Sequence, residues 1–333
     1  MKKERLQQVL AGATKKSIAV IGDVMLDRFI YGKVSRISPE APVPVVEVIR
    51  ESNYPGGAAN VARNLRPFCR EVFICSLTGE DSHAAELRGL VSEGGVSTDL
   101  LLASSAYATT VKTRIIARQQ QLVRVDREKK QILDSSMLKQ VLEHLEKNAH
   151  KLDAIILEDY GKGFLSQELV DGVISIFQKH DCIITVDPNP YNPLGWQGIH
   201  AIKPNRSEAF LAAGEPPAEP ADNPCEDAPL LRVGAKLMQL WRTNCLLITL
   251  GEHGMLLFTV NAPPFHIPTK AREVFDVSGA GDTAIALFTV ALAAGASAHE
   301  AAEISNFASG VVVGKLGTAT LTPQELLESI TSG

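Results

Sequence analysis

The sequence is short of aromatic residues and contains neither a block of basic residues nor a long apolar run. Aromatic side chains make up 5% of its 333 residues and the formal net charge is −5, which argues against a nucleic-acid partner. Its most apolar stretch, residues 284–298, is too short to cross a bilayer and is interrupted by Thr289, Gly295 and Ser297. No continuous apolar segment follows the basic residues at the start, so no signal peptide is recognised. We therefore expect a cytoplasmic protein without a membrane or nucleic-acid partner.

Paired cysteines and two common nucleotide-binding motifs are also missing. The five cysteines are scattered without a Cys-x-x-Cys pair, and no histidine lies near them at a ligand spacing. This pattern indicates reduced thiols and excludes a typical zinc site. Residues 310–316 lack the spacing and the Ser/Thr of a P-loop, and no Gly-x-Gly-x-x-Gly follows the first predicted strand. The second absence weakens the hypothesis of a dinucleotide-dependent oxidoreductase.

Short apolar runs alternate with helical patterns along most of the chain. This alternation predicts an α/β fold with a mostly parallel sheet covered by helices on both faces. The strands are expected at residues 17–21, 72–77, 154–157, 183–186, 199–202 and 245–249. Residues 42–50 follow prolines and predict an edge strand, whereas residues 109–126 predict two antiparallel strands with one wet face. We expect one domain over residues 1–333, with these strands forming a small β excursion.

Residues 276–282, Asp-Val-Ser-Gly-Ala-Gly-Asp, are the most informative segment because they lead directly into an apolar run. If a helix starts here, its first N–H groups lack intrahelical acceptors, and its dipole adds roughly half a positive charge. Gly279, Ala280 and Gly281 leave these groups open to a phosphoryl group. Asp282 places a carboxylate beside this anion cradle, which suits removal of a proton and indicates phosphoryl transfer to a hydroxyl. The alternative is a glycine-rich helix start capped by an acid.

A second glycine turn precedes another predicted helix. Gly56 and Gly57 let the backbone approach a ligand closely, and Asn60 can both donate and accept hydrogen bonds. The turn therefore suits binding of sugar hydroxyls. The alternative is a tight turn before a helix, which glycine commonly marks.

Asn205 and Glu208 have the spacing that places two side chains on one face of a first helical turn. Their oxygens suit Mg²⁺ on nucleotide phosphates, held partly through water. The alternative is a helix-capping box, and the two interpretations are compatible.

Residues 249–254 combine a predicted strand end with a Gly-x-x-Gly turn. Thr249, Gly251 and Gly254 are candidates to pass beside the phosphates or the ribose of a nucleotide. The alternative is a hairpin turn into a strand at residues 255–260.

Polar residues end several predicted strands, at the edge where ligands gather in open parallel sheets. They are Asp23, Asp159, Asp187, Asn205 and Gly251. The basic residues Arg114, Arg118 and Lys162 are candidates to bind a substrate phosphate, with a solvated surface as the alternative.

The Gly-Gly-x-x-Asn, Asn-x-x-Glu and Asp-x-x-Gly-Ala-Gly-Asp motifs occur in the order found in the PfkB (ribokinase-like) family of carbohydrate kinases, which the sequence resembles over most of its length. Several segments are more similar still to the kinase module of bacterial heptose-phosphate enzymes. These segments are residues 22–28, 35–45, 55–62, 112–126, 159–163 and 311–318.

The resemblance implies a ribokinase-like sheet with a β-strand lid, formed by residues of about 42–50 and 109–126. It also implies ATP- and Mg²⁺-dependent phosphorylation of D-glycero-D-manno-heptose 7-phosphate at O1, in the synthesis of ADP-heptose for lipopolysaccharide. A homodimer through the lid strands is implied as well. The sequence contains no His-x-Gly-His motif, so the adenylylation step is expected from another protein.

The resemblance also assigns roles to individual residues. Asp282 would be the catalytic base, and Gly279, Ala280 and Gly281 the anion hole. The acceptor sugar would be bound by Asp23, Asp27, Gly56, Gly57, Asn60, Arg118, Asp159, Lys162 and Asp187. ATP would be bound by Lys203, Asn205, Thr249, Gly251, Gly254 and Asn306. Asn205 and Glu208 would organise Mg²⁺, and Asp276 with the turn at residues 314–320 resembles a site for K⁺ or another monovalent cation.

Two hypotheses compete with a heptose 7-phosphate kinase. One is a PfkB kinase for another acceptor, such as fructose, ribose or adenosine. The other is a sugar- or nucleotide-binding regulator without catalysis, against which the intact Asp282 argues, since a pure binder needs no base there.

Overall fold

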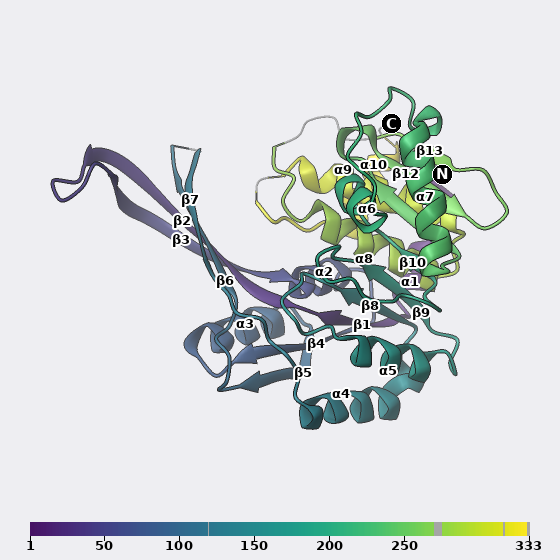
Figure 1. Ribbon diagram of the computed structural model, residues 1–333, viewed down its shortest axis with the longest axis horizontal. Helices are drawn as coiled ribbons and strands as arrows, with labels where there is room; N and C mark the ends of the chain where they lie inside the picture. The colour runs from purple at the N-terminus through teal and green to yellow at the C-terminus, as the bar shows by residue number, and fades with distance from the viewer. Residues whose placement is uncertain (119, 270–274, 316, 332–333) are drawn as a thin grey trace.

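The protein, described here from a computed structural model, is built around one large and one small β-sheet (Figure 1). The structure describes residues 1–118, 120–269, 275–315 and 317–331. The large sheet has nine strands in the order β13-β12-β11-β10-β9-β8-β1-β4-β5. Its strands are β1 (Ser17–Gly22), β4 (Glu71–Gly79), β5 (Ser97–Ser104), β8 (Ala154–Glu158), β9 (Ile183–Asp187), β10 (Ala201–Ile202), β11 (Cys245–Thr249), β12 (Met255–Thr259) and β13 (Phe265–Ile267).

The strands from β5 to β11 run parallel, and β12 and β13 add an antiparallel edge. Each predicted apolar run is one of these strands, so the predicted parallel sheet is confirmed. Alternation along β1 shows why both faces are covered. Ile18 and Val20 pack into one buried cluster, whereas Ala19 and Ile21 pack into the other, because successive side chains of a strand point to opposite faces.

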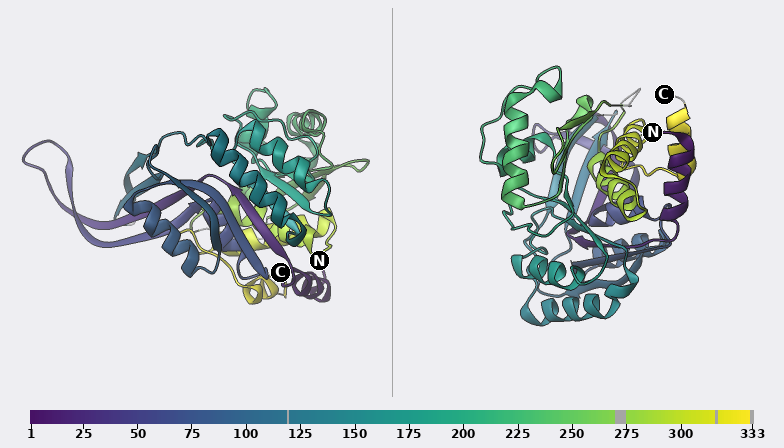
Figure 2. Two further views of the ribbon diagram at one scale, coloured as in Figure 1. Left: turned by 90° about the horizontal axis from the view of Figure 1, so that it is seen from below. Right: turned by 90° about the vertical axis from the view of Figure 1, so that its right-hand side faces the viewer.

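Helices cover both faces of the large sheet, as the end-on view in Figure 2 shows. One face is covered by α1 (Lys3–Ala13), α2 (Ala58–Leu65), α3 (Ser82–Glu93), α8 (Ala280–Ala293), α9 (Ala298–Val313) and α10 (Pro323–Thr331). The other face is covered by α4 (Ser135–Asn148), α5 (Gln167–Phe177), α6 (Arg206–Ala212) and α7 (Ala228–Trp241). Single 3₁₀ turns are η1 (Ala149–Lys151), η2 (Pro224–Glu226) and η3 (Gly251–His253).

The apolar stretch at residues 284–298 belongs to two helices, since α8 ends at Ala293 and α9 begins at Ala298. Ten consecutive residues of α8, from Asp282 to Ala291, are buried, so the stretch is a core helix, as its length predicts. Among the described residues, no helix combines the length and the apolarity that crossing a bilayer requires.

The small sheet, here called the lid, projects from the body as a long twisted ribbon (Figure 1). It has the order β3-β2-β6-β7, with β2 (Val24–Ile37), β3 (Pro44–Gly57), β6 (Val111–Ala117) and β7 (Gln120–Arg127). The predicted strands at 42–50 and 109–126 are present, and β3 lies at the sheet edge as its prolines predict. The sequence analysis did not predict β2 and ended β3 too early. The buried apolar run in β2 is only Val24–Leu26, and most of the rest of β2 and most of β3 are partly or fully exposed, so the sequence pattern is weak.

Candidate active site

The segment at residues 276–282 forms a helix start, as predicted. Gly279 adopts a left-handed conformation with φ of 80°, and α8 begins at Ala280. The Ala280 N–H donates to the Val277 carbonyl, whereas the N–H groups of Gly281 and Asp282 have no backbone acceptor among the described residues. Of the predicted set, the Ala280 N–H is engaged, whereas those of Gly279 and Gly281 have no acceptor among the described residues; the Asp282 N–H is open in addition. Open amides at the positive end of a helix suit an anion.

The Asp282 carboxylate is buried and held from two sides. Asn60 Nδ2 on α2 donates to Oδ2 at 2.6 Å, and the Tyr160 hydroxyl donates to Oδ1 at 2.7 Å. Burial raises the pKa of Asp282 above its ordinary value, and the bonds from Asn60 and Tyr160 offset part of that rise. Burial also raises the pKa of Tyr160 well above its usual range, so the phenol stays a donor. A fixed carboxylate with a raised pKa is suited to accept a proton.

A second side-chain hydrogen bond fixes α2 against α8. The Thr283 hydroxyl donates to Asn64 Oδ1 at 2.9 Å, and Asn64 Nδ2 donates to the Asn60 carbonyl. The Asn60 side chain thus has little freedom to leave Asp282. Its Oδ1 is buried without a partner in the described structure, which leaves one acceptor available for a ligand hydroxyl.

Lys203, Asp187 and Glu158 form a buried charged group behind the cradle. Lys203 Nζ lies 2.8 Å from Asp187 Oδ2, and a Cβ placed on Gly281 would lie 3.7 Å from that ammonium. Lys203 therefore adds a cation directly beside the open amides. Burial raises the pKa of Asp187 to about 7, against the opposing effect of Lys203. Burial, followed by Asp187, raises the pKa of Glu158 well above its usual range.

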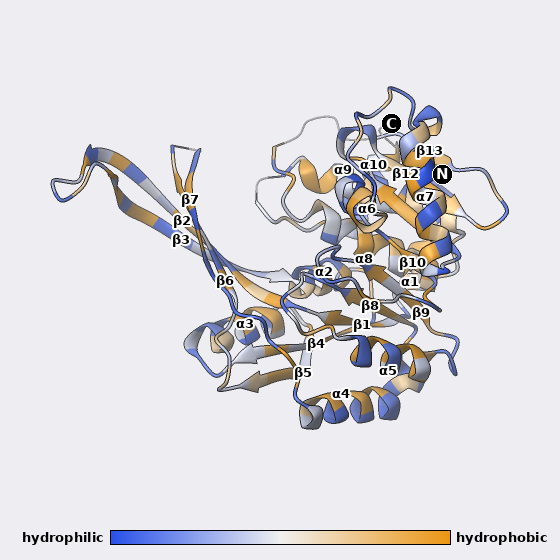
Figure 3. Ribbon diagram, viewed as in Figure 1, coloured by the Kyte–Doolittle hydropathy of each residue, from blue (hydrophilic) through white to orange (hydrophobic). Residues whose placement is uncertain are grey.

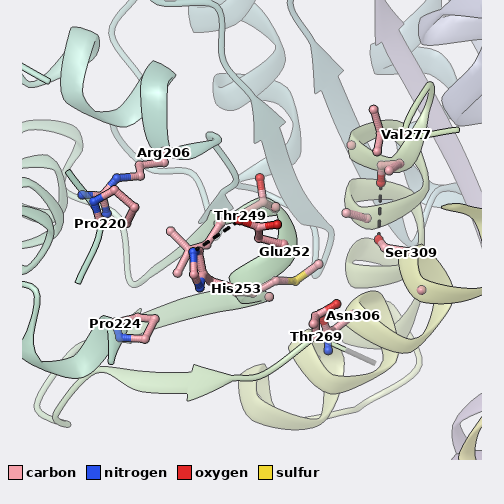
Figure 4. A pocket seen from close by; sticks show the side chains of 18 of the residues that line it. Arg206, Pro220, Pro224, Thr249, Glu252, His253, Thr269, Val277, Asn306 and Ser309 are labelled. Atoms are coloured by element: carbon pink, nitrogen blue, oxygen red, sulfur yellow. Dashed lines mark hydrogen bonds and ion pairs between the residues drawn. The ribbon is translucent and has the colours of Figure 1, made fainter. Parts of the chain in front are cut away.

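A cavity of about 750 Å³ opens beside the start of α8 (Figure 4), and its size is within the range of small-molecule sites. It brings together Ala280, Gly281 and the predicted ATP-side residues Thr249, Gly251, Gly254 and Asn306. The hairpin alternative is also correct, because η3 joins antiparallel β11 and β12. The turn therefore serves both as a hairpin connection and as a cavity wall.

The opposite wall of the cavity depends on Arg206 at the start of α6. Its guanidinium pairs with Asp227 at 2.8 Å, and it donates to the Ala218 carbonyl at 3.0 Å. These contacts fix the segment that carries Pro220 and Pro224 against the cavity (Figure 4). Residues 215–229 were predicted as a surface loop. They include residues that line the cavity, the turn η2 and the start of α7.

Asn205 and Glu208 form the capping box of α6, each side chain accepting from the other's backbone N–H. Glu208 also acts electrostatically on Lys203 and Asp187. Within the described ranges, no group of three or more His, Cys, Asp or Glu side chains is arranged to bind a metal. The donor set does not form a direct protein cage, but it fits Mg²⁺ held through water and nucleotide phosphates.

Two acids predicted on the acceptor side organise a loop in the structure. The Asp23 carboxylate accepts the backbone N–H groups of Tyr160, Lys162 and Phe164. Asp159 accepts from Gly161 N and from Asn192 Nδ2, and burial raises its pKa to about 7. These contacts position Tyr160, the donor to Asp282. Sugar binding by the two acids stays a prediction.

Gly56 and Gly57 lie at the end of β3 rather than in a free turn. Gly57 has φ of 62° and caps α2. A side chain on Gly56 would collide with the Asp27 carboxylate, which forms an ion pair with Arg114 across the lid. The glycines thus make room for Asp27, and Arg114 pairs with this acid; phosphate binding by Arg114 stays a prediction.

The remaining predicted basic and cation-binding residues contact residues other than Asp282, or are exposed. Arg118 is exposed at the turn between β6 and β7, and no described contact joins it to the carboxylate. Lys162 Nζ pairs with Glu128 at 2.7 Å. Asp276 accepts backbone N–H groups from Ser278 and Gly317. The turn at 314–320 includes residue 316, which lies outside the described residues.

Four residues near the site were not assigned roles from the sequence. Tyr160 and Glu158 lie at the end of β8, beside the predicted Asp159. Lys112 alternates with Arg114 on β6, and Arg63 follows Asn60 by one helical turn on α2. The sequence offered a signal for three of them: Glu158 and Tyr160 lie at a strand end, and Arg63 has an i,i+3 spacing from Asn60.

A methyl group at residue 279 should disturb both the backbone and Asn60. A Cβ on Gly279 would lie 2.8 Å from Asn60 Nδ2. We expect Gly279→Ala to cost about 1–2 kcal/mol for a left-handed backbone and to lower kcat about 10²-fold through misplacement of Asn60. Unfolding and steady-state kinetics would measure this. Gly89→Ala on α3, where a Cβ meets nothing within 4 Å, is the control; equal kcat values would contradict the prediction.

Open helix amides beside a buried carboxylate suit phosphoryl transfer to a hydroxyl group. The chain belongs to the pfkB family of carbohydrate kinases, whose family profile matches residues 15–325. The predicted family and its sugar kinase class are therefore confirmed.

Curated relatives share this similarity. The chain is 38% identical over 330 residues to the bifunctional protein HldE of Pelobacter propionicus and 43% identical over 313 residues to HldE of Caulobacter vibrioides. The alignments cover 99% and 93% of this chain but 66% and 62% of those relatives. The chain thus spans less than two thirds of their length.

Solved structures agree on the fold. Arabidopsis thaliana ribokinase complexed with ribose and ATP has a TM-score of 0.71, and Escherichia coli phosphofructokinase-2 in complex with potassium has 0.76. Each is 17% identical; the matches cover 95% and 96% of this chain and 99% of each of the others. They confirm the ribokinase-like α/β fold.

Proposed function

We propose that the protein transfers the γ-phosphoryl group of ATP to O1 of D-glycero-D-manno-heptose 7-phosphate, giving the 1,7-bisphosphate for ADP-heptose synthesis. One observation carries the phosphoryl-transfer mechanism: the Asp282 carboxylate is held by Asn60 and Tyr160 beside two open helix amides. The choice of acceptor is supported by the resemblance to heptose-phosphate kinase modules and by the identity to proteins named HldE.

The chemistry needs alignment, one proton acceptor and stabilisation of charge. The acceptor hydroxyl lies against Asp282, which takes its proton as the oxygen bonds to the γ-phosphorus. The bond from that phosphorus to the β,γ-bridging oxygen breaks, and ADP leaves with the electron pair. The Gly281 and Asp282 amides and the Lys203 ammonium stabilise the charge that develops on the transferring group.

Asn205 and Glu208 would hold Mg²⁺ largely through water, and the bound ion would neutralise charge on the nucleotide phosphates. Asp276 stays the predicted ligand of a monovalent cation. The dependence of kinase activity on K⁺ is measured by replacing K⁺ with tetramethylammonium in the assay.

A coupled assay of ADP release tests the function. The acceptors are heptose 7-phosphate, the unphosphorylated heptose, fructose, ribose and adenosine. The proposal expects the highest kcat/KM for heptose 7-phosphate. A higher value for another acceptor makes the chain a pfkB kinase of that compound, and no ADP release with any acceptor supports the non-catalytic regulator.

We also propose that two copies pair through the lid. Segments of the lid are hydrophobic, coloured orange in Figure 3. Its exposed apolar side chains include Ile37, Val43, Val48, Ile49, Leu122, Val123 and Val125. Apolar side chains exposed together on one element suit an interaction surface. Edge strand β3 also offers unpaired backbone groups to a partner.

Ile49→Glu should convert a dimer into a monomer, because it places a charge within the proposed contact. Ile49 is 73% exposed in the single chain. Light scattering after size exclusion measures the mass. Ile132→Glu is the matched control, since Ile132 is 58% exposed but lies outside the lid. A wild-type monomer, or a dimer that keeps its mass in Ile49→Glu, would contradict lid pairing.

A further inference from the structure

We propose that the Lys112 ammonium, with Lys162 beside it, binds the phosphate group of a phosphorylated acceptor at the end of the acceptor site opposite Asp282. This inference rests on the proposed function, and it assigns the acceptor phosphate to residues of β6 and of the loop after β8. The sequence analysis placed Arg114, Lys162 and the exposed Arg118 in that role and gave none to Lys112.

Tyr160 connects the two ends of this site. Its hydroxyl donates to Asp282 Oδ1 at 2.7 Å, while Lys112 Nζ lies 5.8 Å from the centre of its ring. The ammonium and the carboxylate thus contact the same side chain, Lys112 over the ring and Asp282 at the hydroxyl. A sugar bound along Tyr160 with one hydroxyl at Asp282 would present a terminal phosphate to Lys112.

The charges around Lys112 leave it without an acidic partner. Arg114 pairs with Asp27, and Lys162 pairs with Glu128. Lys112 forms no ion pair among the residues that the structure describes, although Asp27 and Asp126 are its register partners on β2 and β7. Burial, followed by repulsion from Lys162, lowers the pKa of Lys112, and Asp27, Glu128 and Asp126 oppose that fall. Because each of these acids is paired with another cation, Lys112 itself stays available to a bound anion.

Arg63 adds positive charge from the other side of Asp27. Its Nε is buried without a partner in the described structure, and its guanidinium lies 5.8 Å from the centre of the Tyr54 ring. Asp27 and Asp282 both act on it electrostatically. The cations Lys112, Lys162, Arg63 and Arg114 therefore exceed the acids Asp27, Glu128 and Asp282 by one charge, since Asp126 pairs with Arg124. An anionic phosphate fits this excess better than a neutral sugar end does.

Lys112→Met tests the assignment by removing the charge while keeping most of the stem. We expect kcat/KM for the phosphorylated acceptor to fall about 10–100-fold, mainly through KM, as loss of a charged hydrogen bond predicts. The KM for ATP and kcat/KM for the unphosphorylated sugar should stay unchanged. Lys112→Arg should recover part of the loss. Lys139→Met on α4, whose side chain is 76% exposed, is the matched control and should match wild type.

The acceptor pairs separate this inference from the proposed function. The assay compares heptose 7-phosphate with heptose, and fructose 6-phosphate with fructose. If wild type prefers fructose 6-phosphate and Lys112→Met removes that preference, the heptose acceptor fails and the Lys112 site stands. If wild type uses heptose 7-phosphate and Lys112→Met keeps the full preference for phosphorylated acceptors, the Lys112 site is overturned and the function stands. If wild type shows no preference for phosphorylated acceptors, both the Lys112 site and the proposed heptose 7-phosphate kinase function are overturned.

Discussion

Asp282→Asn is expected to lower kcat by roughly 10²–10⁴-fold, the usual contribution of a general base, while the KM for ATP stays nearly unchanged. The amide has nearly the shape of the carboxylate but cannot take up the acceptor's proton. Asn60 and Tyr160 donate to the two carboxylate oxygens. In the variant the amide oxygen accepts from Asn60 and the new NH₂ group donates to the Tyr160 hydroxyl oxygen, so the side chain keeps its position and loses mainly its basicity. Steady-state kinetics and equilibrium binding of ATP measure the two effects.

The pH profile provides a second test of the same residue. Because the pKa of Asp282 is raised by burial, wild-type kcat should fall as acid protonates the carboxylate, and the variant should lose this acid limb. Asp171→Asn on the exposed side of α5 is the matched control, with wild-type kinetics expected. A near-normal kcat in Asp282→Asn would remove the residue from its role as base.

Lys203→Met is expected to destabilise the fold by about 3–5 kcal/mol, because it leaves a buried carboxylate without its cation. The Lys203 side chain is only 3% exposed, and its ammonium lies 2.8 Å from Asp187. Glu158 lies buried nearby and acts electrostatically on Lys203. Loss of the cation therefore affects more than one acid. Urea unfolding followed by circular dichroism measures the free energy of unfolding.

Two comparisons separate the buried pair from a general effect of losing a lysine. Lys236→Met removes a surface pair with Glu215, also at 2.8 Å but with the lysine 50% exposed, and should cost less than about 1 kcal/mol. The double variant Lys203→Met with Asp187→Asn should recover much of the lost stability, since the uncompensated charge is gone. Similar costs for Lys203→Met and Lys236→Met would disprove the prediction.

The sequence predicted the large sheet well because its strands are buried on both faces. Continuous apolar runs such as Cys245–Thr249 have few other structural explanations in an alternating α/β pattern. The strands of the lid were harder to predict, because a strand that is exposed on one or both faces has no continuous apolar run. Every residue of β7 is exposed, and β2 mixes apolar with charged residues, so its pairing with β3 depends on tertiary contacts.

The site was predicted best where the backbone itself carries the chemistry. The Gly279–Asp282 helix start follows from local sequence, as does the Asn205 capping box. Contacts between distant segments could not be derived this way. Asp23 holds the loop 137 to 141 residues further on, and Tyr160 reaches Asp282 across 122 residues. These contacts depend on which strands are neighbours in the sheet. The identity of a residue at the end of a strand does not reveal that order.

One connection between the lid and the body has a mechanical consequence. β3 ends at Gly57 and α2 begins at Ala58, so no loop separates the lid from the helix that carries Asn60. A swing of the ribbon about its root is therefore transmitted through the main chain to the amide that orients the Asp282 carboxylate. A movement of the lid that admits the sugar would therefore also change the position of Asn60 relative to Asp282, because the two elements are joined directly by the main chain.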